Sequence, residues 1–200
     1  MMPLDVIGAV ANGERRSPRH RDGMPESEMD AHGLRVRIDR HVGTVYEGTG
    51  ADGKPYRVVQ QAPYGYLPGV AGDDGDPYDV YVGAAPAFDR AYVVTQCKAS
   101  TGHYDEQKVM WGFASAADAE SCYRAHTAPS MWGRMGSMPR ERFVEQLEAW
   151  RANPVGTFRA YTDEDDAEAA EMDTLEAALA DDDGSEPEDD DAPDSEPGDA

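Results

Sequence analysis

The sequence predicts a mainly β protein of the α+β type, a small OB-like five-stranded barrel on which two C-terminal helices pack. Three observations predict this fold class. Short runs of alternating apolar and polar residues, rich in β-branched and aromatic side chains, recur between residues 34 and 113. Turn-forming Gly, Asp and Pro residues separate these runs, as they do in small barrels. Beyond Ser115 the apolar spacing changes to three and four residues, which indicates helices.

The predicted strands are short and closely spaced, which suggests a small barrel or a sandwich. They cover residues 34–38, 55–59, 78–82, 91–95 and 108–113. Residues 48–53, Gly-Thr-Gly-Ala-Asp-Gly, lack the Lys-Ser/Thr ending of a phosphate-binding loop. We interpret them as a hairpin connection between strands.

Two helices are predicted after the strands. Ser115 can cap the first helix in an S-x-x-D arrangement, and this helix runs to about His126. The second helix begins at Met138-Pro139, because Pro is tolerated in a first turn, and Asn153-Pro154 ends it. Its apolar side chains share one face that we expect to pack on the barrel: Phe143, Leu147 and Trp150.

Charge and composition divide the chain into three parts. The formal net charge is −22, and residues 163–200 hold 19 of the 40 acidic residues and no Lys or Arg. Residues near the N-terminus show no apolar periodicity. We therefore expect a disordered arm over residues 1–33, a folded domain over 34–155, and an acidic low-complexity tail over 156–200, with a short helix at 166–180.

Composition also excludes several functional classes. No run of apolar residues is long enough for a membrane helix, and the first residues lack the pattern of a secretory signal. The predicted domain has no basic surplus, so we expect no direct binding to nucleic acid and no binding to a membrane. Cys97 and Cys122 have no zinc-ligand spacing and are expected to be reduced thiols. We predict a cytoplasmic protein whose acidic tail is a solubilising segment, with docking to a basic protein partner as the alternative.

The most informative segment is an acidic loop that precedes the predicted strand at 78–82. Its four carboxylates lie within seven positions and belong to Asp73, Asp74, Asp76 and Asp79. Like charges this close repel one another, so the arrangement suits a hard cation such as Mg²⁺, which prefers oxygen ligands. The alternative is a solvated Asp-Gly-Asp-Pro turn. An EF-hand is not supported, because the downstream Glu of a calcium loop is missing.

A second group of charged residues begins the predicted strand at 108–113. Asp105 and Glu106 supply two more carboxylates, and Lys108 supplies a cation. Carboxylates for a metal beside a cation for phosphate are a recurrent requirement of phosphoryl transfer. Each group alone is weak evidence, but the two together favour a phosphate-processing site.

These segments resemble a known family. Tyr64-Gly-Tyr66, followed by Asp74-Gly-Asp76-Pro-Tyr-Asp79, is similar to the signature of the soluble family I inorganic pyrophosphatases. Over about residues 35–150, the chain looks closest to the compact pyrophosphatase-like domain of phage and mobile-element polyvalent proteins. The segments that carry this likeness are Gly-Asp-Asp-Gly-Asp at 72–76, Asp-Val-Tyr-Val-Gly at 79–83 and Tyr-Asp-Glu-Gln-Lys-Val-Met-Trp-Gly-Phe at 104–113.

The resemblance implies an activity and a role for each matching residue. The activity is Mg²⁺-dependent hydrolysis of pyrophosphate, or of a related phosphoanhydride, by metal-activated water without a covalent intermediate. The metal-binding residues would be Asp74, Asp79, Asp105 or Glu106, and Asp39 as an acidic residue near the site. The catalytic residues would be Asp76, which orients or deprotonates the water, Tyr64 and Lys108, which contact phosphate, and Arg57, which grips the electrophilic phosphate, with Lys54 in reserve.

The sequence also departs from the family pattern. Thr101 stands where a metal-binding Asp would be expected, Gln60 replaces a Tyr, and the Tyr-Lys pair of the C-terminal part is missing. A second interpretation therefore stays open, in which the chain is a metal-binding accessory module of a phage or mobile element, associated with the virion, that has little or no catalytic activity. In a third, the acidic tail carries the function.

Overall fold

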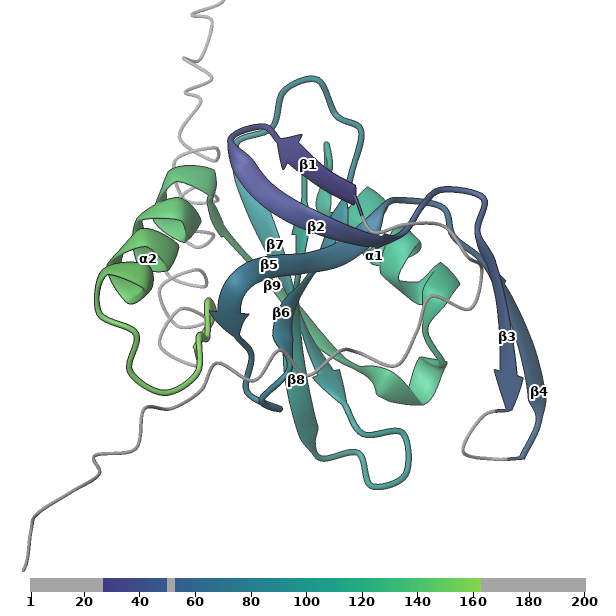
Figure 1. Ribbon diagram of the computed structural model, residues 1–200. Helices are drawn as coiled ribbons and strands as arrows, with labels where there is room; N and C mark the ends of the chain where they lie inside the picture. The colour runs from purple at the N-terminus through teal and green to yellow at the C-terminus, as the bar shows by residue number, and fades with distance from the viewer. Residues whose placement is uncertain (1–26, 50–52, 163–200) are drawn as a thin grey trace, which may run out of the picture. The chain divides into compact units, whose positions relative to one another are not determined.

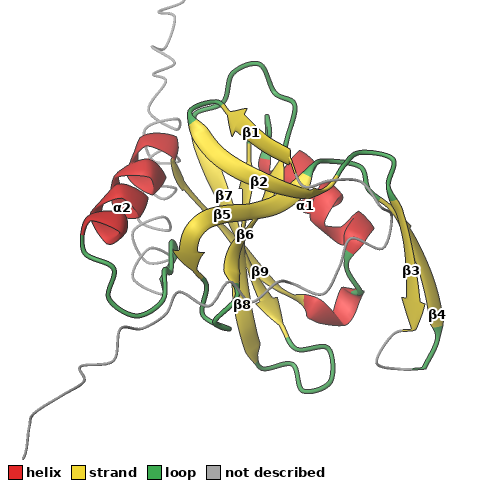
Figure 2. Cartoon of the chain, in the orientation of Figure 1, coloured by secondary structure: helices red, strands yellow, loops and turns green. Residues whose placement is uncertain are grey.

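Nine strands and two α-helices make up the part of the chain that this computed structural model describes, residues 27–49 and 53–162 (Figures 1 and 2). Their order is β1 (Ser27–Ala31), β2 (Leu34–Arg40), β3 (Val45–Thr49), β4 (Pro55–Val59), β5 (Tyr64–Ala71), β6 (Pro77–Val82), β7 (Arg90–Cys97), β8 (Tyr104–Trp111), α1 (Ala116–His126), β9 (Trp132–Pro139) and α2 (Arg140–Ala152). A short 3₁₀ turn, Pro129–Met131, precedes β9.

Seven of the strands form one sheet, in the order β1-β2-β5-β6-β8-β7-β9. Neighbours pair antiparallel except for β6 and β8, which run parallel. The hairpin of β3 and β4 forms a separate two-stranded sheet. The predicted mainly β class with two helices is confirmed. The sheet has seven strands instead of five, however, and within the described residues its hydrogen bonds leave it open between β1 and β9, so it is not a closed barrel.

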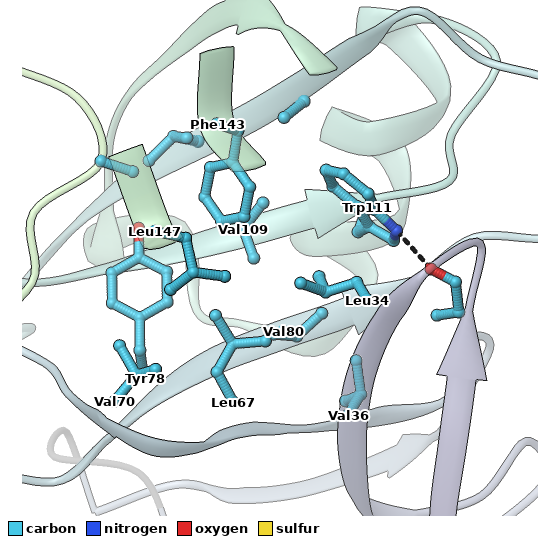
Figure 3. Packing of buried hydrophobic residues seen from close by; sticks show 14 of the residues in the cluster. Leu34, Val36, Leu67, Val70, Tyr78, Val80, Val109, Trp111, Phe143 and Leu147 are labelled. Carbon is cyan, nitrogen blue, oxygen red and sulfur yellow. Dashed lines mark hydrogen bonds between the residues drawn. The ribbon is translucent and has the colours of Figure 1, made fainter. Parts of the chain in front are cut away.

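The seven-stranded sheet is covered by a helix on each face. One face packs with α2 in a cluster that includes Val36, Leu67, Val80, Val109, Trp111, Phe143 and Leu147 (Figure 3). The other face packs with α1 in a cluster that includes Tyr81, Val94, Met110, Ala119, Cys122 and Tyr123. Burial on both faces explains the long apolar runs of β6, β7 and β8.

The folded part extends beyond both predicted limits. The predicted disordered arm 1–33 is wrong for β1, which pairs with β2 over its whole length, and the Trp111 indole N–H donates to the Ala31 carbonyl at 2.7 Å (Figure 3). The tail predicted to start at residue 156 begins with a packed segment, in which Phe158 and Tyr161 are buried in the core. The remaining predictions for the arm, the tail and the helix at 166–180 lie outside the described residues.

Both helices form close to their predicted positions. The Ser115 hydroxyl accepts a hydrogen bond from the Asp118 N–H, as the capping pattern predicts. Phe143 and Leu147 of α2 are fully buried and Trp150 packs against the same cluster, which confirms the predicted apolar face. β9, which lies directly before α2 and ends at Pro139, was not predicted from the sequence. In the described ranges, none of the helices combines the length and apolarity that a membrane crossing requires.

Candidate active site

The site is built around the parallel pairing of β6 and β8, which sets Asp79 directly beside Lys108. The Lys108 ammonium forms an ion pair with Asp79 Oδ2, and a second one with Glu106 Oε1 at 2.9 Å. The Lys108 side chain is only 7% exposed. Burial by itself would lower the pKa of Lys108, but the neighbouring Asp79, Tyr64 and Glu106 raise it well above its usual value. Lys108 is therefore a fixed, charged ammonium.

Tyr64 on β5 is a second residue, besides Lys108, that contacts Asp79. Tyr66 pairs with Asp79 across β5 and β6, and Tyr64, two residues earlier on β5, lies on the same face of the sheet. The Tyr64 hydroxyl donates to Asp79 Oδ2 and lies 3.4 Å from Lys108 Nζ. Burial, together with the negative charge of Asp79, raises the pKa of Tyr64 well above its usual value. The phenol thus stays protonated and acts as a hydrogen-bond donor.

A β-bulge in β8 turns two consecutive carboxylates toward this face. The pairing of β7 with β8 shifts between Gln96 and Cys97, so that Gln96 pairs with Glu106 while Cys97 pairs with Tyr104. Asp105 is the extra residue. Side chains of neighbouring residues normally alternate between faces, but a bulge lets both point the same way. The Gln96 amide nitrogen accordingly reaches Asp105 Oδ2 at 3.2 Å and Glu106 Oε1 at 2.7 Å.

Glu106 carries the clearest electrostatic signature of the site. Its pKa is raised to about 7, first by burial and then by the negative charges of Asp79 and Asp74, although Lys108 acts in the opposite direction. A carboxyl that titrates near neutrality in such a group is a frequent mark of a functional site. Carboxylates that are buried close together need a cation to offset their repulsion, and Lys108 supplies part of that positive charge.

The acidic loop 72–76 splits into two parts with different roles. Asp74 Oδ1 accepts the backbone N–H of Asp76 at 3.0 Å, and both residues are exposed. Asp73 lies elsewhere, because it accepts hydrogen bonds from Tyr104 and Thr157 and forms an ion pair with Arg159 at 2.8 Å. Asp73 therefore anchors the segment after α2, while Asp74 remains with the carboxylate cluster.

The structure does not bring Arg57 to this cluster. Arg57 lies on β4 and pairs with Glu47 of β3 at 3.1 Å, both side chains being more than half exposed. Since side chains alternate along a strand, this pair occupies the hairpin face opposite Tyr46. Arg40, at the end of β2, is the arginine at the site. Its guanidinium carbon lies 4.6 Å from the Tyr46 ring centroid and 4.9 Å from that of Tyr64.

Three further residues complete the description. Asp39 lies half-buried where the register of β2 and β5 shifts, directly before Arg40. Arg37, opposite Tyr66 in the same ladder, donates to the Tyr66 hydroxyl at 3.4 Å. Lys54, the reserve for Arg57, is an exposed residue that precedes β4.

Sequence reasoning missed Arg40 and Gln96 because neither belongs to an acidic motif. The alternation of β2, with Val36 and Ile38 buried, is the signal that places Arg37 on the face opposite the core.

The donor groups of this cluster are of the kind that Mg²⁺ prefers. The available ligands are hard carboxylate oxygens, and Asp74, Asp79 and Glu106 lie close enough for their charges to interact. Within residues 27–49 and 53–162, no group of three or more Asp, Glu, His or Cys side chains is arranged to hold a metal ion. Lys108 lies between Asp79 and Glu106, and it competes with a metal for both carboxylates.

A comparison with known families gives one match. The family described as Inorganic Pyrophosphatase matches residues 19–152, two thirds of the chain and nearly the whole described domain. No curated protein and no solved structure matches the chain. The matched region contains every residue of the carboxylate and lysine cluster, and the implied activity class is a diphosphatase-type hydrolase with a phosphoanhydride substrate. The narrower link to phage and mobile-element domains stays a prediction. The chain belongs to the inorganic pyrophosphatase family.

Proposed function

We propose that the protein hydrolyses inorganic pyrophosphate, or a closely related phosphoanhydride, with Mg²⁺ as its cofactor. The observation that carries this proposal is the convergence of Asp79, Glu106 and Lys108 on one face of the sheet, in a domain of the pyrophosphatase family. Water adds to one phosphorus, the bridging P–O bond breaks, and two orthophosphate ions leave.

In this proposal Lys108 and Arg40 are the cations that contact the substrate. Lys108 is held by two carboxylates and is charged at every working pH, so its ammonium is oriented before the substrate arrives. Arg40 presents a planar guanidinium that suits two phosphate oxygens at once. Cations fixed in this way stabilise the negative charge that builds up on the leaving phosphate. Tyr64 donates to Asp79 and keeps that carboxylate in place beside Lys108.

The proposed metal-binding residues are Asp74, Asp79, Asp105, Glu106 and Asp39. Mg²⁺ bound there would neutralise phosphate charge and lower the pKa of a coordinated water. Asp76, exposed on the loop 72–76, is proposed to accept a proton from the attacking water. The exposed position lets its carboxylate approach a substrate without losing a buried partner.

The test is release of orthophosphate from pyrophosphate by the full chain, with Mg²⁺ and with a chelator. We expect Asp79→Asn to lower the rate by roughly 10²-fold or more, because the amide can neither fix Lys108 nor serve as an anionic ligand. Asp89→Asn, at an exposed position before β7, removes the same charge and should stay within about two-fold of the wild-type rate. Metal-independent release, or an Asp79→Asn variant with wild-type activity, would contradict the proposal.

One observation favours a second candidate, a metal-binding module without turnover. Lys108 already neutralises Asp79 and Glu106, and Thr101 stands in an exposed turn where a further ligand was expected. This candidate predicts that Mg²⁺ raises the melting temperature of the protein, while no phosphate is released from pyrophosphate or from nucleoside triphosphates. Measuring melting and phosphate release on the same sample separates the two candidates.

A further inference from the structure

We infer that Gln96 is a positioning residue for the metal site, and that Tyr123 of α1 fixes the Gln96 side chain in the orientation that holds Asp105 and Glu106 together. This inference rests on the proposed function, because it concerns the same carboxylates. It assigns a task to two residues outside the acidic motifs, and it connects the site to α1, the helix that covers one face of the sheet.

Both hydrogens of the Gln96 side-chain amide have acceptors, and its oxygen has a donor. Its side-chain nitrogen has two hydrogens, and the structure gives it two acceptors, Asp105 Oδ2 at 3.2 Å and Glu106 Oε1 at 2.7 Å. Its side-chain oxygen accepts the Tyr123 hydroxyl at 2.9 Å. Gln96 is only 3% exposed, so water does not replace these partners.

Tyr123 decides which way the amide points. A rotated amide would turn its oxygen toward two carboxylates and its nitrogen toward a hydroxyl, which would bring acceptors together at the bulge. The Tyr123 ring is fully buried in the α1 cluster and contacts the Tyr81 and Trp132 rings, so the hydroxyl has a fixed position. Burial also raises the pKa of Tyr123 to about 12, which keeps the hydroxyl protonated as a donor.

The hydrogen bonds of Gln96 offset the repulsion between the two carboxylates that the bulge brings to one face. Two consecutive carboxylates on one face repel each other. A single neutral donor between them draws both toward the same point without adding a charge that would compete with a metal. Lys108, by contrast, is a charged competitor for Glu106. Gln96 thus orients the carboxylates and leaves their remaining oxygens available, as outer partners of metal ligands commonly do.

The experiment compares four forms of the full chain by calorimetric titration with MgCl₂. Gln96→Leu removes both donors at similar volume, and we expect about 10- to 100-fold weaker Mg²⁺ binding. Tyr123→Phe removes one hydroxyl and should weaken binding in the same direction by a smaller factor. Gln107→Leu is the matched control, since Gln107 is also a buried glutamine, next to Glu106 on β8, but it binds Ala160 and Tyr161 on the opposite side. The acidic tail is identical in all forms and contributes equally.

A second readout separates positioning from loss of stability. At high Mg²⁺ the Gln96→Leu protein should recover most of the wild-type kcat, because its ligands are still present, whereas a merely destabilised protein would not respond in this way. Wild-type Mg²⁺ affinity in Gln96→Leu, or equal weakening in Gln107→Leu, would overturn the inference. If Gln96→Leu does not fold, Tyr123→Phe decides alone.

The two proposals fail in distinguishable ways. If the chain binds Mg²⁺ with the expected order among the variants but releases no phosphate from pyrophosphate, the proposed function falls and the positioning role stands. If hydrolysis is strong while Gln96→Leu keeps the wild-type requirement for Mg²⁺, the positioning role falls alone. If the wild-type chain does not bind Mg²⁺ at all, both are overturned.

Discussion

Arg40 contacts two aromatic rings, and this packing gives its guanidinium a defined position next to Tyr64 of the cluster. Tyr46 comes from the separate hairpin and Tyr64 from the main sheet. A cation held over ring faces loses little further freedom when it binds an anion, so a phosphate contact there costs less ordering than one made by an exposed side chain. Arg57, by contrast, is exposed and forms an exposed ion pair with Glu47.

This difference between the arginines can be measured. Arg40→Ala should lower kcat/KM for pyrophosphate by about 10²- to 10³-fold, the usual cost of removing a fixed group that stabilises transition-state charge. Arg57→Ala should change it by less than roughly three-fold, because an exposed ion pair contributes little. Steady-state phosphate release at saturating Mg²⁺ is the measurement. A larger loss in Arg57→Ala than in Arg40→Ala would return the role to the β4 hairpin.

The sequence could not choose between these arginines, for a physical reason. Both lie in extended segments with alternating side chains, so either can face a site if its strand is turned the right way. The orientation of the β3–β4 hairpin relative to the main sheet is a tertiary feature, carried by contacts such as the Tyr46 hydroxyl with the His126 carbonyl. Motif spacing was a better guide to Asp79 and Lys108 than to the arginines, because both of these residues lie on strands of the main sheet.

At the scale of elements, the end of α1 is joined to the segment before β5 by one imidazole. His126 Nε2 accepts the backbone N–H of Gln61 at 2.9 Å, and its Nδ1 faces the Cys122 carbonyl within the helix. The ring needs an unprotonated Nε2 to make the first contact. Burial lowers the pKa of His126, and the Cys122 carbonyl opposes this only in part. The neutral ring thus belongs to the folded state.

The sign of the pH dependence follows from that pKa. A folded-state pKa below the unfolded value of about 6.5 means that the unfolded chain binds the extra proton first. The contribution of His126 to stability is therefore complete above about pH 6.5 and is lost as the pH falls through the folded pKa. His126→Leu should cost about 1–3 kcal/mol at pH 7.5, since the Gln61 N–H loses its acceptor, and less at pH 5.

Urea denaturation of both proteins between pH 5 and 7.5 tests this. Glu106 also titrates in this range, but it is present in both proteins and cancels in the difference between them. A difference in unfolding free energy that stays constant with pH would show that His126 packs as a neutral spacer and does not titrate with folding.

Elements were predictable from sequence where packing and local propensity agree. α1 and α2 have a cap or an apolar stripe that belongs to the helix itself. β9 has neither, because its packing demands glycine: a side-chain carbon on Gly136 would lie 2.2 Å from the Tyr161 ring, and one on Gly133 would lie 2.6 Å from the Thr95 carbonyl oxygen. Glycine lowers strand propensity, so the same close contacts that place β9 remove its signal from the sequence.

At the scale of the whole molecule, each end of the domain packs onto the main sheet in a way that spacing along the chain cannot reveal. β1 pairs with β2, and the Trp111 indole N–H on β8 donates to the carbonyl of Ala31, the last residue of β1. At the other end, the Phe158 N–H donates to the Ala71 carbonyl at 2.7 Å, and the Gln107 amide holds the backbone of residues 160 and 161. Short polar and glycine-containing segments such as these look like linkers until the core they complete is known.

Phe158 gives the sharpest test of where the domain ends. Its ring is 3% exposed and meets Tyr78, Phe143 and Trp150, so Phe158→Ala should leave a cavity and cost about 3–5 kcal/mol. Val155, which lies at the limit predicted from sequence, is 73% exposed, and Val155→Ala should change stability by less than about 0.5 kcal/mol. Urea denaturation of both variants decides the matter. If Phe158→Ala unfolds at the wild-type midpoint, residues 156–162 contribute nothing to the core; a large shift confined to Phe158→Ala means that any truncation intended to remove the acidic tail must keep the chain through Tyr161.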